Sequence, residues 1–443
     1  MRRQNRFSIG DGRSVNEGQQ AGSDRPSRCG LSTRGENPMR IRTIRWLSVV
    51  VGLVFALGVV LSALPAAAAK KPLVIGTAIS LTGKRAKSGL LTLRGYEMWQ
   101  KDVNAKGGLL GRKVKIKVYD DESNPTTGAK LMERLITLDK VEFIFGPFSS
   151  PVTYATSTVT EKYGFPMIAG GSSSSKPFSR GYKYLFQVMR VNNDSHLGNL
   201  TLLKQKGAKS VSVIHSASIY PASLAKGVVR LAKKMGFKVL SVDKYPPKST
   251  DFTSLLIKAK GLDPDVLFLF GYYPDGLAIT KQVKELNLNP RHLGVMLGAS
   301  YDEFGSDKGM GKDSDFVGGY SGWEPFLDTP GNKEFVKKYF QQYKDDRFLD
   351  SHVIYGYLCG QVLARAANEV GSMDRDKIRD AIAKMKFKSY MPGHFEVDPK
   401  TGMQIGHEWA SFQWQNGKKV ILWPKSAATG ELLYPAPSWK KRK

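Results

Sequence analysis

A chain of 443 residues is long enough for two or three domains of ordinary size, and its 41% hydrophobic and 24% charged residues describe a globular protein with a substantial core. The formal net charge is +28 at pH 7, and residues 1–69 contribute ten Lys or Arg and four Asp or Glu, which leaves +22 for the rest. Because the basic residues are spread along the chain and are not interleaved with aromatic residues, the charge argues against a nucleic-acid-binding protein. It favours a basic, solvated surface suited to acidic ligands or to an anionic membrane face.

The N-terminus carries the pattern of an export signal over residues 39–69. Three arginines lie within Met39–Arg45, an uninterrupted apolar run follows from Trp46 to Leu64, and small residues precede Ala69, where we expect cleavage. The apolar run is also long enough for an uncleaved membrane anchor, which is the alternative. Residues 1–38 are polar and rich in arginine, and we interpret them as a disordered extension or as sequence upstream of a true start at residue 39.

After residue 70 the chain alternates short apolar strands with amphipathic helices. We expect strands at residues 71–79, 113–121, 141–146 and 165–171, and helices at residues 94–107 and 124–140. The strand at 113–121 alternates as an edge strand does, and the helix at 124–140 has Asn124 as its N-cap and Pro125 in its first turn. The pattern restarts after Gly181, with strands at 210–216, 238–245 and 265–271 and helices at 193–207, 223–236 and 274–287.

Strands that alternate with helices of this length predict parallel sheets built from βαβ units. Two such runs, each of about four or five strands, predict an α/β fold of two doubly wound parallel-sheet lobes. After Gly319 we expect long helices at 332–343 and 352–370, and then strand-like pieces at 393–397, 407–414 and 418–423. Because no linker rich in Pro, Gly or Ser separates the two runs, the crossings between the lobes must be short, which suits a hinge.

Sequence signatures of catalysis and of metal or cofactor binding are missing. No G-x-S-x-G motif occurs, and GMGKDS at 309–314 lacks two residues that a phosphate loop requires. The six histidines are scattered, His407-Glu408 has no second histidine at helical spacing, and Asp120–Glu122 is interpreted as a loop. We therefore predict no enzyme activity, no cofactor and no metal site. The one cysteine after the signal, Cys359, is expected in the core.

Small polar residues and tyrosines gather in loops that follow the expected strands. GPFSSP (146–151) and GGSSSS (170–175) follow two strands of the first run, and SASIYPAS (216–223) and GYYPDG (271–276) follow two strands of the second. In a doubly wound sheet, ligands bind outside the carboxyl ends of the strands. We therefore expect a cleft lined with N–H, hydroxyl and aromatic groups, which suits a small ligand with a carboxylate or amide head and an apolar body.

The junction at Ser149-Ser150 admits two interpretations. A serine there can cap the helix that follows, which is the plainer interpretation. Alternatively, the unpaired N–H groups of the helix N-terminus, together with the serine hydroxyls, can hold an anion or a carboxylate.

Several stretches match one known family in their order and spacing: KGGLLGRKVKIKVYDDESNPTTGAKLMERLI, GPFSSPVTYA, FPMIAGGSSS, IHSASIYPASLA, FLFGYYPDG and a closing W-x-x-F-x-W. Over residues 71–423 the chain resembles the periplasmic branched-chain amino-acid-binding family, the solute receptors of ABC importers. The resemblance implies the type I periplasmic binding fold, in which two α/β lobes joined by three crossings close on a ligand. Lobe 1 would comprise residues 71–190 and 321–391, and lobe 2 residues 191–320 and 392–443.

The resemblance also implies which residues bind the ligand. The implied set is Ser149, Ser150, Gly171, Ser172, Ser173, Tyr220, Tyr272 and Trp323. The ligand's carboxylate would be held by Ser150, the backbone of Gly171 and Ser173, whereas Tyr220 and Tyr272 would cover the ligand from lobe 2. Trp323 would line the mouth of the cleft or, alternatively, pack at the hinge. This carry-over favours the carboxylate interpretation of the Ser149-Ser150 junction.

One departure from the family concerns the ammonium group of an amino-acid ligand. Family members that bind amino acids pair this group with a glutamate in a Gly-Pro-Glu turn, and the matching LGASYDE (297–303) places Ala299 or Ser300 there. Asp302 is out of register and Glu324 is more distant, so Ser300, Asp302 and Glu324 are further candidates. A buried ammonium without a partner is costly. The ligand is therefore an amino acid with a substitute partner, or an amide or an aromatic or aliphatic acid that lacks the amine.

Ser88 is a last candidate, because it lies where many relatives place an aromatic residue over the ligand side chain, and it would leave room for a bulkier ligand. Together these features predict an exported, periplasmic and monomeric receptor that delivers a small ligand to an ABC permease in the inner membrane. A sensory ligand-binding subunit for a signalling receptor is the alternative, and no nucleic-acid partner is expected.

Overall fold

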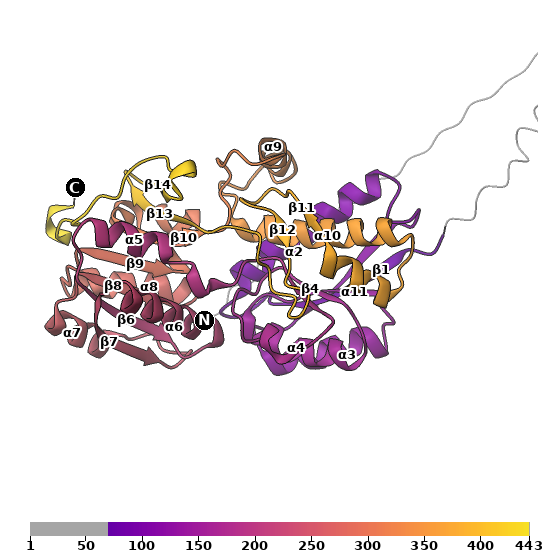
Figure 1. Cartoon of the computed structure of the whole chain (residues 1–443), viewed down its shortest axis with the longest axis horizontal. Coiled ribbons are helices and arrows are strands. Elements are labelled where there is room, and N and C mark those ends of the chain that lie inside the picture. Colours follow the sequence, from indigo (N-terminus) through magenta and orange to yellow (C-terminus); the bar gives the residue numbers. More distant parts are fainter. Residues whose placement is uncertain (1–69, 443) are drawn as a thin grey trace, which may run out of the picture. The chain divides into compact units, whose positions relative to one another are not determined.

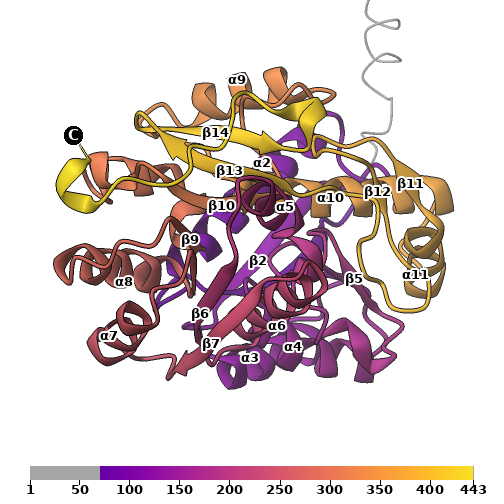
Figure 2. The same ribbon diagram turned by 60° about the vertical axis from the view of Figure 1, so that its left-hand side comes forward.

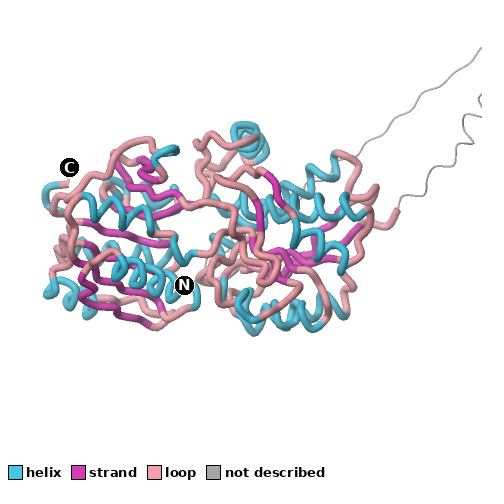
Figure 3. The backbone as a smooth tube through the Cα atoms, in the orientation of Figure 1, coloured by secondary structure: helices cyan, strands magenta, loops and turns pink. Residues whose placement is uncertain are grey.

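The computed structural model describes residues 70–442, so the predicted export signal and the segment before it lie outside the described residues. Two β-sheets organise this part of the chain, and their strands are drawn in magenta in Figure 3. None of the helices described is both long and apolar enough to cross a membrane.

The first sheet has five parallel strands in the order β2-β1-β3-β4-β5. The strands are β1 (Leu73–Ile79), β2 (Val114–Asp120), β3 (Phe143–Phe145), β4 (Met167–Ala169) and β5 (Leu185–Gln187). The alternating strand β2 lies at the edge and pairs only with β1 in this sheet, from Leu73 opposite Val114 to Ile79 opposite Asp120. The edge-strand prediction is therefore confirmed.

The second sheet has seven strands in the order β14-β13-β10-β9-β8-β6-β7. The strands are β6 (Ser210–Ser216), β7 (Lys238–Tyr245), β8 (Val266–Phe270), β9 (His292–Met296), β10 (Val317–Ser321), β13 (Ala410–Gln415) and β14 (Lys418–Trp423). The strands β6 to β10 are parallel, whereas β13 and β14 add to β10 as an antiparallel hairpin. Figures 1 and 2 both show this hairpin beside β10. A further pair, β11 (Lys386–Phe387) and β12 (Phe395–Glu396), stands apart from both sheets.

Helices accompany each sheet, as the alternating pattern predicts. The helices that contact or connect strands of the first sheet are α2 (Ala86–Ala105), α3 (Pro125–Thr137), α4 (Ser150–Lys162) and α10 (Ser351–Val370), and α11 (Arg375–Lys384) packs against α10. Those of the second sheet are α5 (Leu197–Gln205), α6 (Ile219–Lys234), α7 (Thr253–Leu262) and α8 (Tyr273–Glu285), and α9 (Asn332–Gln342) follows β10. Because α10 packs against α2, the chain passes from one sheet to the other three times.

Local sequence signals account for some helix ends and not for others. The α3 helix begins at Pro125, and the Asn124 side chain accepts hydrogen bonds from the backbone N–H groups of Thr126 and Thr127, so the predicted N-cap is confirmed. The α2 helix begins eight residues before the predicted helix. Its first turns bury only the small side chains of Ser88 and Thr92 beside Gly89, so apolar periodicity does not reveal them.

The packing of α10 on α2 depends on close contact between their backbones. A Cβ on Gly95 would lie 2.1 Å from the carbonyl oxygen of Val353, so only glycine permits this approach. The contact positions the first turn of α10, which contributes a side chain to the candidate site. The lobe boundaries at residues 190, 320 and 391 stay a prediction. The Gln187 N–H donates to the Gly402 carbonyl, so β5 also contacts the segment after residue 391.

Candidate functional site

The junction after β3 leads directly into α4, and Ser149 occupies the N-cap position of this helix. Ser149 has a φ of 108°, an unusual value for a residue other than glycine. Its side chain makes no capping hydrogen bond, and its buried Oγ has no partner among the residues that the structure describes. A capping role therefore does not account for Ser149. A strained backbone and an unpaired hydroxyl at a helix N-terminus are typical of a ligand-binding position.

The loop after β4 packs against this junction. Backbone N–H of Ser174 donates to the Ser150 Oγ at 3.3 Å, and the Ser172 Oγ lies 3.2 Å from the same oxygen. Gly171 forms a parallel bridge with Phe148, and a Cβ at Gly171 would lie 2.9 Å from the Phe148 Cα and 2.6 Å from its ring. The two serine loops therefore form one surface at the carboxyl ends of β3 and β4, and glycine at 171 is required for their contact.

Two tyrosines from the second sheet's helices face this surface. Tyr220 lies in the first turn of α6, and Tyr272 is the N-cap residue of α8, with 6.0 Å between their ring centroids. The Tyr220 hydroxyl pairs with the Tyr320 hydroxyl at 2.9 Å. The Tyr272 hydroxyl is buried and has no partner within residues 70–442, and the guanidinium of Arg85 lies 4.8 Å from its ring centroid.

These groups border a small cavity of about 10 Å³, room for about one water molecule. Its lining residues are Phe148, Ser149, Ser150, Gly171, Ser173, Met189, Tyr220, Tyr272, Leu297 and His352. Six predicted ligand-binding residues are thus brought together, from strand-end loops that belong to both sheets. No Asp, Glu, Lys or Arg is among the lining residues in the described part of the chain.

His352 is the lining residue with the most distinctive chemistry, and sequence reasoning missed it. It lies in the first turn of α10 and is 3% exposed. Burial, with a smaller contribution from the nearby Lys87 ammonium, lowers the pKa of His352 to about 3, so the imidazole is neutral at physiological pH. A lone histidine in an apolar helix carries no motif, so no local signal could have identified it.

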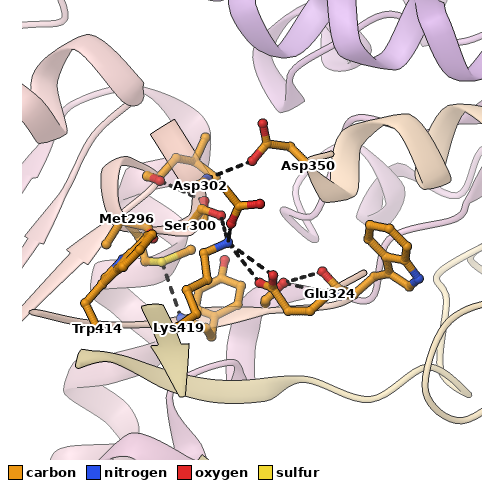
Figure 4. A network of polar contacts seen from close by, with 12 residues as sticks. Met296, Ser300, Asp302, Glu324, Asp350, Trp414 and Lys419 are labelled. Carbon is orange, nitrogen blue, oxygen red and sulfur yellow. Dashed lines mark hydrogen bonds and ion pairs between the residues drawn. The ribbon is translucent and has the colours of Figure 1, made fainter. Parts of the chain in front are cut away.

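The acidic candidates Asp302 and Glu324 lie in a different cluster, shown in Figure 4. The Lys419 Nζ is 2.8 Å from Asp302 Oδ1 and 3.1 Å from Glu324 Oε1, and it donates to the Ser300 carbonyl oxygen at 2.6 Å. The backbone N–H of Asp302 donates to Asp350 at the start of α10. Neither carboxylate lines the cavity, and both are already paired with a lysine whose side chain is 3% exposed.

In this Lys419 cluster, burial disfavours the charged form of each group, and the attraction between the ammonium group and the carboxylates opposes that effect. Burial by itself lowers the pKa of Lys419, but Asp302, Glu324 and Asp350 outweigh it and the pKa is raised. Burial raises the pKa of Glu324, against the attraction of Lys419, and burial together with the Asp302 charge raises the pKa of Asp350. Asp302 and Glu324 therefore have a structural partner, which reduces their availability to a ligand.

A family model settles the class of protein: the model described as "Periplasmic binding protein" matches residues 72–419. This chain belongs to the periplasmic binding protein family. The predicted membership of the periplasmic branched-chain amino-acid-binding family is confirmed. As predicted, this periplasmic binding protein is a non-enzymatic solute-binding protein.

Curated relatives cover most of the chain. The Leu/Ile/Val-binding protein homolog 7 of Brucella melitensis is 27% identical over 388 residues, which are 84% of this chain and 96% of the relative. The Leu/Ile/Val-binding protein homolog 8 of Brucella suis is 26% identical over 397 residues, 86% of this chain and 97% of the relative.

Solved structures show the same fold. A leucine binding protein, LivK, from Thermotoga maritima has a TM-score of 0.71 at 23% identity and covers 79% of this chain and 97% of its own. A solute binding protein from R. palustris in complex with benzoate has a TM-score of 0.71 at 21% identity and covers 79% of this chain and 95% of its own. LivJ from Streptococcus pneumoniae in complex with isoleucine has a TM-score of 0.70 at 22% identity, with 80% and 100% covered. The prediction of a type I periplasmic binding fold is confirmed.

In this periplasmic binding protein the remaining candidates lie outside the cavity lining. Trp323 is fully buried, donates through its indole N–H to Asn332 at 2.8 Å and packs against Phe335. The Ser88 hydroxyl pairs with the Tyr301 hydroxyl, so the side chain of Tyr301 takes up the room beside Ser88. Trp323 and Ser88 therefore pack against neighbouring side chains in this structure. Contact of either residue with a ligand remains a prediction.

Proposed function

We propose that this periplasmic binding protein is the exported receptor of an ABC importer, and that it binds a small carboxylic acid without an ammonium group. The observation that carries the proposal is a cavity that combines an unpaired serine at a helix N-terminus with a lining free of charged side chains, within the described residues. The first feature suits a carboxylate, and the second leaves an ammonium group without an ionic partner.

The carboxylate is assigned to the serine loops. The positive end of the α4 dipole and its unpaired N–H groups favour an anion, and such a position contributes roughly 0.3–1 kcal/mol, or up to about 2 kcal/mol when partly buried. The hydroxyls of Ser149, Ser150 and Ser173 and the backbone of Gly171 supply neutral donors at the same place. Because the lining has no cation, the affinity for the acid rests on hydrogen bonds and the helix terminus.

The ammonium group of an amino acid has no comparable partner. Its only candidate acceptors in the lining are hydroxyls, carbonyl oxygens and the neutral imidazole of His352. Asp302 and Glu324 are held by Lys419, and moving either toward a ligand would break a buried ion pair. An acid or an amide without the amine avoids this cost, and Phe148, Tyr220 and Tyr272 offer aromatic contacts to its apolar body.

Domain closure belongs to the same proposal. We assign residues 71–190 and 321–391 to lobe 1 and residues 191–320 and 392–443 to lobe 2. Ion pairs join the start of α2 to the second sheet's side, between Lys84 and Asp275 and between Lys87 and Glu303. In the proposed cycle the ligand binds lobe 1 first, and closure adds these pairs and the tyrosine contacts. A monomer released into the periplasm by cleavage near Ala69 would then dock on an inner-membrane permease.

A thermal-shift screen of purified residues 70–443 tests this proposal. The panel holds branched-chain and polar amino acids, short amides, and aromatic and aliphatic carboxylic acids, because a ligand that binds only the folded state raises the melting temperature. We expect acids or amides without an amine to give the largest shifts. Shifts produced only by amino acids would refute the ammonium-free ligand, and a Ser150→Ala variant that bound the acid as tightly as the wild type would refute the assigned carboxylate site.

A further inference from the structure

His352 presents an unusual side chain to the cavity. Its imidazole is stacked on the Tyr301 ring, with centroids 5.3 Å apart and planes 2° from parallel, and it meets the Phe148 ring edge-on at 5.2 Å. Both ring nitrogens are buried, and neither has a hydrogen-bond partner in residues 70–442. A buried polar atom left unpaired destabilises the folded protein, so these nitrogens favour any ligand that can pair with them.

The protonation state limits what His352 can recognise. Because the imidazole is neutral, one ring nitrogen carries a hydrogen and donates, and the other has a lone pair and accepts. Lys87 is the charged side chain that affects the pKa of His352, and its ammonium group forms an ion pair with Glu303 at 2.5 Å. The ring therefore offers one donor and one acceptor at a place where the aromatic walls hold its orientation fixed.

Different ligand groups satisfy such a ring to different degrees. A carboxylate can only accept and an ammonium can only donate, so each suits only one of the two nitrogens, and a methyl group suits neither. A hydroxyl both donates and accepts, so it can pair with whichever nitrogen faces the ligand. A site built to bond a hydroxyl rejects the analogue without it strongly, because the buried site groups are then left unpaired.

We propose that His352 is a specificity-determining residue that hydrogen-bonds a hydroxyl group on the ligand, so that the preferred ligand is a hydroxy-substituted carboxylic acid. This inference rests on the proposed function, because the serine loops must hold the ligand carboxylate while His352 hydrogen-bonds the ligand hydroxyl. The hydroxyl lies either on an aromatic ring or next to the carboxylate, and matched pairs of acids distinguish these positions.

The test measures dissociation constants for matched acids by titration calorimetry. The pairs are benzoate and 4-hydroxybenzoate, 3-phenylpropanoate and 3-(4-hydroxyphenyl)propanoate, and 4-methylpentanoate and 2-hydroxy-4-methylpentanoate. For at least one pair, wild-type protein is expected to bind the hydroxylated acid about tenfold or more tightly, the ratio that corresponds to about 1.4 kcal/mol. The pair that shows the preference identifies where the hydroxyl lies.

Three variants separate recognition from packing. His352→Phe keeps the aromatic stack, and it is expected to bring the preference to about one. His352→Asn keeps a donor and an acceptor and is expected to retain part of the preference. His292→Phe is the matched control, since His292 is also buried with an unpartnered Nε2 and does not line the cavity. It is expected to leave the preference unchanged.

The outcomes separate this inference from the function on which it rests. If the acids bind but wild-type protein shows no preference in any pair, or if His352→Phe keeps the preference, the role of His352 is refuted and the proposed function stands. A fourth variant, Tyr272→Phe, tests the neighbouring hydroxyl. If it abolishes the preference and His352→Phe does not, Tyr272 is the residue that bonds the ligand hydroxyl. If no acid of any pair binds, the proposed function fails and this inference fails with it. Should His352→Phe not fold, the His352→Asn ratios decide.

Discussion

Replacing Lys419 by methionine removes the ammonium group that pairs with both Asp302 and Glu324 (Figure 4) and keeps a side chain of similar length. Lys419 and Glu324 have side chains that are each 3% exposed, and the Asp302 side chain is 23% exposed. The variant therefore leaves a fully buried carboxylate and a partly buried one without a counter-charge. Removing one partner of a buried ion pair costs about 3–5 kcal/mol, a large part of the roughly 5–15 kcal/mol that stabilises a typical domain.

The size of this loss depends on pH, and the sign follows from the pKa shifts. Burial raises the pKa of Glu324 and of Asp350 in the folded protein. Stability from a raised acid pKa is fully present below the unfolded pKa and is lost as the pH rises through the folded pKa. Without Lys419 both pKa values rise further, so we expect the loss of stability to be larger at about pH 8 than at about pH 5, by up to about 1.4 kcal/mol per pH unit for each proton.

Urea-induced unfolding of wild-type protein and of the Lys419→Met variant at both pH values measures the effect. Lys418→Met is the matched control, because Lys418 lies on the same strand and is exposed, and it should change stability by less than about 0.5 kcal/mol. Combining Lys419→Met with Glu324→Gln should restore part of the loss. A loss below about 1 kcal/mol, or an equal loss at both pH values, would refute the argued role of the cluster.

Three further predictions concern the site and its supports. Gly171→Ala should lower the free energy of unfolding by about 1–3 kcal/mol and weaken ligand binding at least about tenfold, since its Cβ would collide with Phe148. The melting temperature measures the loss of stability, and calorimetry measures the loss of affinity. Burial raises the pKa of Asp121 to about 6, so the stability from Asp121 is lost as the pH rises through about 6, and the melting temperature of Asp121→Asn relative to wild type should increase from about pH 5 to pH 8. Lys87→Met, which removes the ion pair to Glu303, should weaken binding up to about fivefold at low salt and less at high salt.

Each of these predictions has a result that contradicts it. Unchanged binding by Gly171→Ala would show that the two serine loops can separate without harm to the site. A parallel pH dependence of the wild type and Asp121→Asn would place the titration elsewhere. If Lys87→Met binds the ligand more weakly than wild-type protein by the same factor at every salt concentration, the loss comes from packing and not from an ionic interaction.

Motifs with local physical causes could be read from the sequence. The N-cap at Asn124, the edge character of β2 and the alternation of strands and helices all depend on residues close together in the chain, and all are present in the structure. Six of the eight main ligand-binding candidates line one cavity, because strand-end loops of parallel sheets converge at the carboxyl ends of the strands. Their role in binding stays a prediction until ligands are measured.

Contacts between distant segments lay beyond the reach of sequence reasoning. Asp302 and Glu324 were candidates for an ammonium partner, and only the tertiary structure shows that Lys419, at least 95 residues further along the chain, already pairs with them. His352 gave no signal, because its role comes from the burial of both ring nitrogens between Phe148 and Tyr301. The sequence by itself determined the fold class and the position of the serine and tyrosine loops, since periodicity and turn residues act locally. The charge of the cavity was decided by tertiary structure alone, because pairing and burial depend on which distant side chains the fold brings together.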